Sequence, residues 1–210
     1  RKDQTYFLHG IPSGDLPRLM FPLSELTKTE VRKIARKLKL SAANKPDSQE
    51  VCFVPKDYRK FLKYELNETP LPGEFTSISG EVLGEHQGLP FYTIGQRRGL
   101  GLSDTTPYYV VKIDKEHNRI VLGKEDDLYS KTISVSSVNW VSISAPETPL
   151  SASVKLRSAH HGAIATLIPE SGNKVRLELE NPERAVTPGQ AAVFYQKNIL
   201  LGGGWIDSSN

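Results

Sequence analysis

From about residue 69 to its end, the chain is a succession of short extended runs separated by proline and glycine, and this pattern constrains the fold most. Turn residues at Ser79-Gly80 and around Asn118 separate the first of these runs. The runs have strand-like residue patterns and lie at 74–78, 81–83, 108–114 and 119–122. They predict a small β-rich domain in the middle of the chain.

Beyond about residue 130 the strands continue, and two of them alternate between apolar and polar residues. In 152–157 and 174–180 the apolar side chains fall on one face of an extended chain. Further extended runs lie at 163–168, 191–195 and 199–206. About six strands in roughly 80 residues predict a small barrel or a sandwich. Gly202-Gly203-Gly204 then forms a bend or bulge, because it lacks the Lys and Ser/Thr of a phosphate loop.

The front of the chain is helical in pattern instead. Residues 27–30 read Thr-Lys-Thr-Glu, a capping box that predicts the start of a helix. Apolar residues follow it at helical spacing: Val31, Ile34, Ala35 and Leu38. We expect this helix to dock on a core and to present a basic outer face. The run 51–54 indicates a buried strand or strand-like turn, and 57–66 a second short helix. The predicted fold class is α+β to mainly β.

A single cysteine among 210 residues excludes a disulfide framework and a cysteine-based zinc cluster within the chain. The sequence contains no secretory segment and no apolar run of about 20 residues, so a reduced, cytoplasmic setting without a membrane is predicted. His160-His161 is a weak metal signal, because adjacent strand residues point to opposite faces. We therefore expect no bound metal.

Charge is distributed unevenly along the chain. Residues 1–60 carry 13 Lys or Arg against 7 Asp or Glu, whereas the remaining 150 residues carry 14 against 17. A basic front end indicates a polyanionic partner, or simply a solvated helix face. The segment 86–100, HQGLPFYTIGQRRGL, permits the same two interpretations. Arg97 and Arg98 either bind phosphates through bidentate hydrogen bonds or face solvent in a tight turn.

Cys52 also permits two interpretations. A lone cysteine in an apolar run packs as a small hydrophobe. The mostly polar segment that precedes it, Lys45 to Glu50, is instead typical of a reactive thiol at the edge of a site. Composition leaves both open.

Several motifs together resemble the tRNA-specific 2-thiouridylase family, in order and over essentially the whole chain. They are KDQTYFL at 2–8, Phe21-Pro22-Leu23, DSQEVCF at 47–53, Pro72-Gly73, HQGLPFYTIGQRRGLG at 86–101, TPGQAAVFY at 187–195 and LLGGGWI at 200–206. The resemblance implies three parts. These are the C-terminal part of an ATP-pyrophosphatase domain (1–66), a central tRNA-binding domain (67–130) and a C-terminal β-barrel (131–210). The family's SGGxDS loop and first cysteine are absent from this sequence, so a fragment without the ATP site is expected.

The resemblance also implies roles for individual residues. Cys52 carries a persulfide and transfers its sulfur to the wobble uridine of tRNA. The other residues that the family motifs place at the tRNA are Lys2, Asp3, Gln4, Arg157, Ser158 and Gln190. Ser158 replaces a more usual tyrosine, which removes a stacking group there. Arg97 and Arg98 are expected only as tRNA backbone contacts.

Adenylation of the uridine C2 oxygen by ATP precedes sulfur transfer in the implied reaction, since the oxygen is otherwise a poor leaving group. The implied partners are tRNA and a persulfide sulfur donor protein fed by a cysteine desulfurase, and the protein is expected to be monomeric. The chain alone is expected to bind tRNA without modifying it. The alternative is a non-catalytic RNA-binding module in which Cys52 is structural. A thiol redox protein is disfavoured, because no second cysteine is present.

Overall fold

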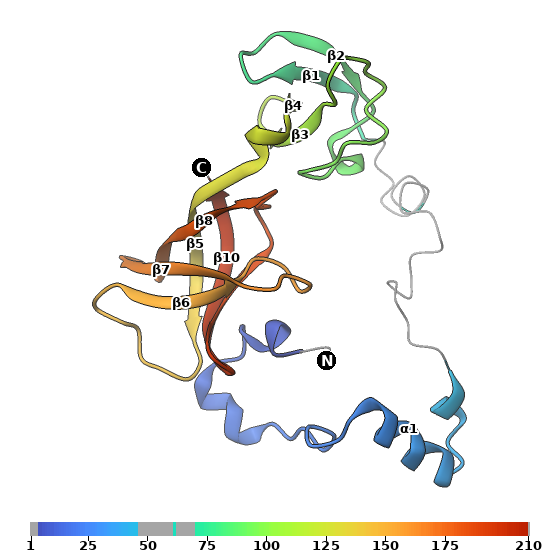
Figure 1. Cartoon of the computed structure of the whole chain (residues 1–210), viewed down its shortest axis with the longest axis vertical. Helices are drawn as coiled ribbons and strands as arrows, with labels where there is room; N and C mark the ends of the chain where they lie inside the picture. The colour runs from blue at the N-terminus through green and yellow to red at the C-terminus, as the bar shows by residue number, and fades with distance from the viewer. Residues whose placement is uncertain (1–3, 46–60, 62–69, 210) are drawn as a thin grey trace. The chain divides into compact units, whose positions relative to one another are not determined.

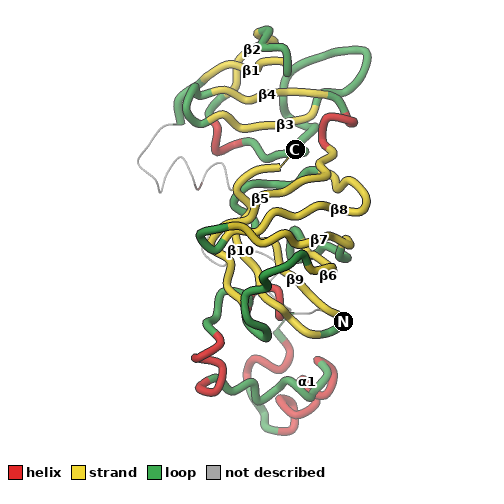
Figure 2. The backbone as a smooth tube through the Cα atoms, turned by 90° about the vertical axis from the view of Figure 1, so that its left-hand side faces the viewer, coloured by secondary structure: helices red, strands yellow, loops and turns green. Residues whose placement is uncertain are grey.

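The structure is a computed structural model, and it describes residues 4–45, 61 and 70–209. Contacts divide the chain into two compact units, Arg1–Gly14 with Pro70–Asn210, and Asp15–Thr69. The first unit contains every strand of the described chain (Figures 1 and 2). The predicted class, α+β to mainly β, is confirmed.

The last part of the first unit is a closed barrel of six strands in the order β10-β5-β8-β7-β6-β9; the strands are labelled in Figure 2. Its strands are β5 (Tyr129–Trp140), β6 (Leu150–Lys155), β7 (Ala163–Glu170), β8 (Lys174–Arg184), β9 (Ala191–Gln196) and β10 (Ile199–Ser209). All neighbours are antiparallel. Of the two architectures that the sequence allowed, the barrel is the one formed.

The barrel is filled by the apolar residues that alternate along its strands, including Leu177 and Leu179 of β8. The strand β5 is the one for which the sequence analysis gave no range. Its inward residues Ile133 and Val135 alternate, but Ser137 then takes a φ of +50° and Val138 becomes the next buried residue. This local irregularity breaks the two-residue period and hides the strand from pattern analysis.

The glycine triplet lies in β10, where register shifts interrupt pairing with both neighbours. A Cβ on Gly204 would stand 2.5 Å from the carbonyl oxygen of Ser136, and one on Gly202 would collide with that of Asn139. The predicted bulge is confirmed, and these glycines permit the close approach of β5 and β10.

The middle of the chain is a four-stranded sheet in the order β2-β1-β4-β3, in which β1 and β4 are parallel. Its strands are β1 (Gly73–Ser77), β2 (Val82–His86), β3 (Tyr109–Asp114) and β4 (Arg119–Gly123). The two predicted turns are present, with positive φ at Gly80 (+89°) and Asn118 (+50°). All four strands were predicted, each end to within three residues.

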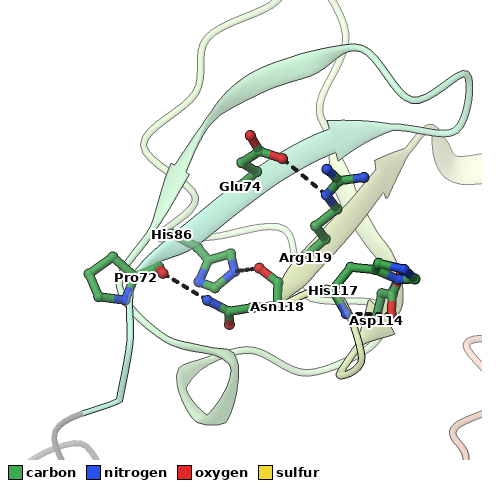
Figure 3. Close-up of polar contacts among 7 residues, drawn as sticks. All are labelled: Pro72, Glu74, His86, Asp114, His117, Asn118 and Arg119. Atoms are coloured by element: carbon green, nitrogen blue, oxygen red, sulfur yellow. Dashed lines mark hydrogen bonds and ion pairs between the residues drawn. The ribbon is translucent and has the colours of Figure 1, made fainter.

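His86, at the end of β2, contacts the turn between β3 and β4 (Figure 3). The side chain is only 1% exposed, its Nε2 lies 3.1 Å from the carbonyl oxygen of Asn118, and its Nδ1 accepts from Gly88 N at 3.0 Å. These partners require the neutral imidazole with its proton on Nε2. The Asn118 side-chain amide also donates to the carbonyl oxygen of Pro72. The turn between β3 and β4 is therefore bonded both to the end of β2 and to the residue before β1.

The second unit contains the helix α1 (Lys28–Lys37), which begins with the predicted capping box. Glu30 N donates to the Thr27 hydroxyl, and Thr27 N donates to the Glu30 carboxylate. The expected docking on a core is not seen in the described part of the chain: Ile34 is 44% exposed and Leu38 62% exposed. The capping box depends on local residues alone, whereas docking depends on residues distant in sequence.

Five short 3₁₀ helices complete the described structure: Thr5–Leu8, Ser13–Arg18, Ser41–Asn44, Leu89–Phe91 and Glu125–Leu128. No helix in the described ranges is both long and apolar enough to span a membrane. The predicted run at 51–54 lies outside the described residues, as does the helix at 57–66 except for Phe61, which is helical.

Candidate nucleic-acid interface

An open pocket of about 310 Å³ lies within the first unit, between a loop of the small-sheet region and one end of the barrel. Its lining comes from Thr93 to Gly95, from Leu156 and Arg157 after β6, from Arg184 at the end of β8 with Ala185 to Thr187 after it, and from Gln190 before β9. Two arginines and one glutamine supply the charged and amide groups, and no carboxylate is among these lining residues. The pocket therefore offers hydrogen-bond donors and positive charge, as phosphate-bearing ligands require.

Two turns of the same type contribute to this pocket, the TIGQ turn (Thr93–Gln96) and the TPGQ turn (Thr187–Gln190). In each, the amide of the fourth residue donates to the carbonyl of the first, at 3.0 Å and 3.2 Å respectively. The third residue is a glycine with φ of +83° in the first turn and +85° in the second. Type II turns place glycine there, because L-residues avoid positive φ.

Arg157 and Ser158 lie in the turn that follows β6, and both are exposed. His160, only 8% exposed, holds this turn: its amide donates to Arg157 O at 2.9 Å, and its Nδ1 accepts from Leu156 N at 3.4 Å. The opposite ring nitrogen, Nε2, lies 3.1 Å from a carboxylate oxygen of Glu183 on β8. His160 thus fixes the backbone that presents Arg157 to the pocket.

Arg184 joins the barrel to the small-sheet region at the pocket. Its Nε donates to Glu125 Oε1 at 2.6 Å and its Nη2 to Oε2 at 3.4 Å. Its guanidinium carbon lies 5.5 Å from the ring centre of Tyr109. The hydrogen bond to Glu125 raises the pKa of Arg184, and the Arg184 guanidinium lowers the pKa of the Glu125 carboxyl, with Tyr109 and Arg97 adding to that effect.

Gly95 lies close to the opposite wall of the pocket. A Cβ on Gly95 would stand 2.9 Å from the Cβ of Ala185 and 3.6 Å from Nη1 of Arg184. Gly95 N also donates to Val110 O at 2.8 Å, which fixes the loop to β3. The distance between the walls is therefore set by a residue without a side chain.

Gln4 is exposed and lies at the start of the segment that packs against β9. Two residues later, the buried Tyr6 donates its hydroxyl to the carbonyl oxygen of Ala191 at 2.9 Å. Burial raises the pKa of the Tyr6 hydroxyl, so it stays protonated as a donor. Because Ala191 directly follows Gln190, the chain that carries Gln4 is anchored beside the TPGQ turn. The sequence gave no indication of this contact.

Arg97 and Arg98 are both exposed, and neither lines the pocket. The Gln96 side chain accepts from Thr93 N at 3.1 Å and donates to Arg98 O at 3.0 Å, which holds the turn that carries the two arginines. Three other predicted site residues, Lys2, Asp3 and Cys52, lie outside the described residues.

The part of the chain that the structure describes contains no group of three or more His, Cys, Asp or Glu side chains that could hold a metal ion. His160 and His161 differ in environment, since His160 is buried against Glu183 and His161 is exposed.

Three protein-family models match successive parts of this chain. The tRNA methyl transferase HUP domain matches residues 1–56, the tRNA methyl transferase PRC-barrel domain 59–124, and the aminomethyltransferase β-barrel domain 130–206. A tRNA-specific 2-thiouridylase MnmA of Symbiobacterium thermophilum is 45% identical over 208 residues, which are 99% of this chain and 53% of the relative. The chain belongs to the tRNA-specific 2-thiouridylase family. The resemblance found in the sequence is confirmed.

Other members of the 2-thiouridylase family match equally well. The MnmA of Carboxydothermus hydrogenoformans is 45% identical over 99% of this chain and 57% of its own length. That of Acetivibrio thermocellus is 43% identical over 98% of this chain and 58% of its own length. The chain thus spans a little over half the length of these 2-thiouridylases.

Sequence analysis found two residues of the pocket, Arg157 and Gln190, and missed the rest. Thr93 to Gly95 were part of a noted glycine-rich motif, but nothing placed them opposite the barrel. Arg184 precedes the TPGQ turn in the run ERAVTPGQ, which is the only signal that could have identified it.

Proposed function

We propose that this chain supplies the tRNA-binding region of a tRNA-uridine 2-sulfurtransferase. In this proposal, the pocket between the TIGQ and TPGQ turns contacts the tRNA. One observation carries the proposal: Arg157 and Gln190, which family motifs assign to tRNA contact, are 33 positions apart in sequence and line the same pocket. The pocket also combines arginines with an amide group, which suits phosphate and base edges. Lys2, Asp3, Gln4 and Ser158 make further contacts with the tRNA in this proposal, and Arg97 and Arg98 contact its backbone.

The complete protein, in this proposal, converts the wobble uridine of tRNA to 2-thiouridine. ATP adenylates the C2 oxygen, so that AMP becomes the leaving group at that carbon. The terminal sulfur of a persulfide on Cys52 attacks C2, and a second cysteine then breaks the S–S bond, releasing 2-thiouridine and leaving a disulfide with Cys52. That second cysteine and the SGGxDS loop for ATP are not in this sequence, so both are assigned to other parts of the protein.

A separate persulfide-carrying protein, loaded by a cysteine desulfurase, supplies the sulfur. The protein acts as a monomer in the cytoplasm, with predicted domain boundaries after residues 66 and 130. The names of the relatives, all tRNA-specific 2-thiouridylases, support the 2-thiolation of tRNA.

The binding claim is tested by titrating the 210-residue chain with a tRNA transcript at several salt concentrations. Arg157→Ala and Gln190→Ala are each expected to weaken binding, and Arg157→Ala also to reduce the salt dependence, because one phosphate contact is lost. His161→Ala, a change of an exposed residue outside the pocket lining, is the control. Wild-type affinity in both pocket variants would sink the proposal.

The chemical claim is tested in the complete natural protein with Cys52→Ser. We expect 2-thiouridine formation to be abolished while tRNA affinity stays at the wild-type value. Normal thiolation would leave the alternative, a non-catalytic RNA-binding module with a structural cysteine.

A further inference from the structure

Arg184, at the end of β8, shares the pocket with Arg157 and Gln190, yet no family motif assigned it a role. We propose that Arg184 is a further tRNA backbone contact, whose guanidinium binds a phosphate through the edge turned toward the TIGQ loop. The proposal rests on the proposed function, because it places a third polar group in the same pocket.

The geometry of the guanidinium supports a second ligand. Glu125 takes Nε and Nη2, one edge of the planar fork. Nη1 takes no part in that pair and is the nitrogen nearest Gly95, 3.6 Å from the position of a Cβ there. An arginine held along one edge by a carboxylate has its orientation fixed in advance, so little side-chain entropy remains to be lost when a phosphate binds the other edge.

The local charge also favours an anion. Glu125 offsets one positive charge, but Arg157 lines the same pocket. The charge of Arg97 also contributes to lowering the pKa of the Glu125 carboxyl. The lining of the pocket therefore carries two arginines, Arg157 and Arg184, and no carboxylate. The Tyr109 ring beneath Arg184 adds a cation–π contact that holds the guanidinium plane in place.

The same strand provides a matched control. Arg176 of β8 is also paired with glutamates, Glu170 at 3.2 Å and Glu178, but does not line the pocket. Arg176→Ala removes an equal charge and a comparable ion pair from the same strand. Any general effect of net charge on RNA affinity appears in both variants. The loss of a phosphate contact appears only in Arg184→Ala.

The test measures tRNA affinity of the 210-residue chain against salt concentration for Arg184→Ala, Arg184→Lys, Glu125→Gln and Arg176→Ala. Arg184→Ala is expected to weaken binding on the order of tenfold at low salt and to lower the slope of log Kd against log salt by about one. Arg184→Lys keeps the slope, because the charge remains. Arg176→Ala and Glu125→Gln also keep it, because neither removes a phosphate contact.

A purely structural role for Arg184 predicts a different pattern. Arg184→Ala and Glu125→Gln would then weaken binding equally and leave the slope unchanged, and this result would overturn the proposal. Arg157→Ala separates the two claims. If it lowers affinity and slope while Arg184→Ala does not, only the present inference fails. If neither variant has an effect, the proposed function fails with it. Thermal unfolding of each variant verifies that the chain is folded at the assay temperature.

Discussion

The TIGQ turn of the small-sheet region and the TPGQ turn of the barrel have nearly the same backbone but use their glutamines in opposite ways. Gln96 folds back and bonds to its own loop, to Thr93 N and Arg98 O. Gln190 makes no side-chain hydrogen bond within the described structure and lines the pocket. Gln96 stabilises its own loop, and Gln190 is available to a ligand.

The difference follows from what comes after each turn. After Gln190 the strand β9 begins at once, and its backbone groups are satisfied by pairing with β6 and β10. After Gln96 comes an irregular loop, whose backbone groups have no ladder to join and take a side chain instead. A motif of four residues therefore does not define a role; its structural neighbours do.

The largest expected effect distinguishes the two turns by their glycines. Gly95→Ala forces an L-residue into positive φ, at about 1–2 kcal/mol, and adds a close contact with Ala185 that costs about 1–3 kcal/mol more. Gly189→Ala incurs only the first cost, because nothing lies within 4 Å of its Cβ position. Chemical denaturation should show the larger loss of unfolding free energy for Gly95→Ala. Equal losses would mean that the two walls of the pocket are not in contact at Gly95.

The next effect concerns the turn that presents Arg157. His160→Ala removes the acceptor of Leu156 N and the partner of Glu183, with a loss of about 2 kcal/mol of unfolding free energy and weaker tRNA binding. The neighbouring His161 is exposed, so His161→Ala should change stability by less than about 0.5 kcal/mol. In an Arg157→Ala background, His160→Ala should no longer reduce affinity. A full loss of affinity there would show that His160 does not act through Arg157.

A smaller effect comes from the glutamines themselves. Gln96→Ala loses two hydrogen bonds at a partly exposed site, so we expect a cost of about 1 kcal/mol in stability. Gln190→Ala should leave stability within about 0.5 kcal/mol and reduce tRNA affinity several-fold. The opposite pattern, with Gln190→Ala destabilising and Gln96→Ala affecting only affinity, would reverse the roles assigned to the two turns.

The smallest expected effect is a dependence of stability on pH that comes from His86 of the small sheet. Burial lowers the pKa of His86 from its ordinary 6.5, partly offset by the bond to Asn118 O. Because the folded pKa is below the unfolded one, His86 contributes stability above about pH 6.5 that is lost as pH falls through the folded pKa. Unfolding of His86→Gln should lose this pH dependence. An unchanged pH profile in that variant would assign it to another group.

Local patterns predicted local structure well, and long-range packing poorly. The capping box at Thr27 and the alternation in β8 depend on neighbours in sequence, and both are as expected. The strand β5 escaped because one residue of positive φ, Ser137, shifts its buried face. The pocket escaped because Gly95 and Ala185 are 90 positions apart in sequence, and no periodicity reports such a contact.

The family motifs found Arg157 and Gln190 because the resemblance carries their roles with it. The same reasoning could not identify Arg184. Its orientation is fixed by the carboxylate of Glu125 and the ring of Tyr109, which come from other elements. For this site, sequence resemblance proposed two tRNA contacts, Arg157 and Gln190, and the structure shows that both line one pocket.

The most direct test of the account is a titration of the ¹⁵N-labelled chain with a tRNA transcript, following the side-chain amide signals of both glutamines by NMR. If the pocket is the tRNA contact, the Gln190 amide shifts or broadens early, while the Gln96 amide, already bonded within its own loop, moves much less. Tight binding with the Gln190 amide unmoved would place the tRNA elsewhere on the protein and contradict the account.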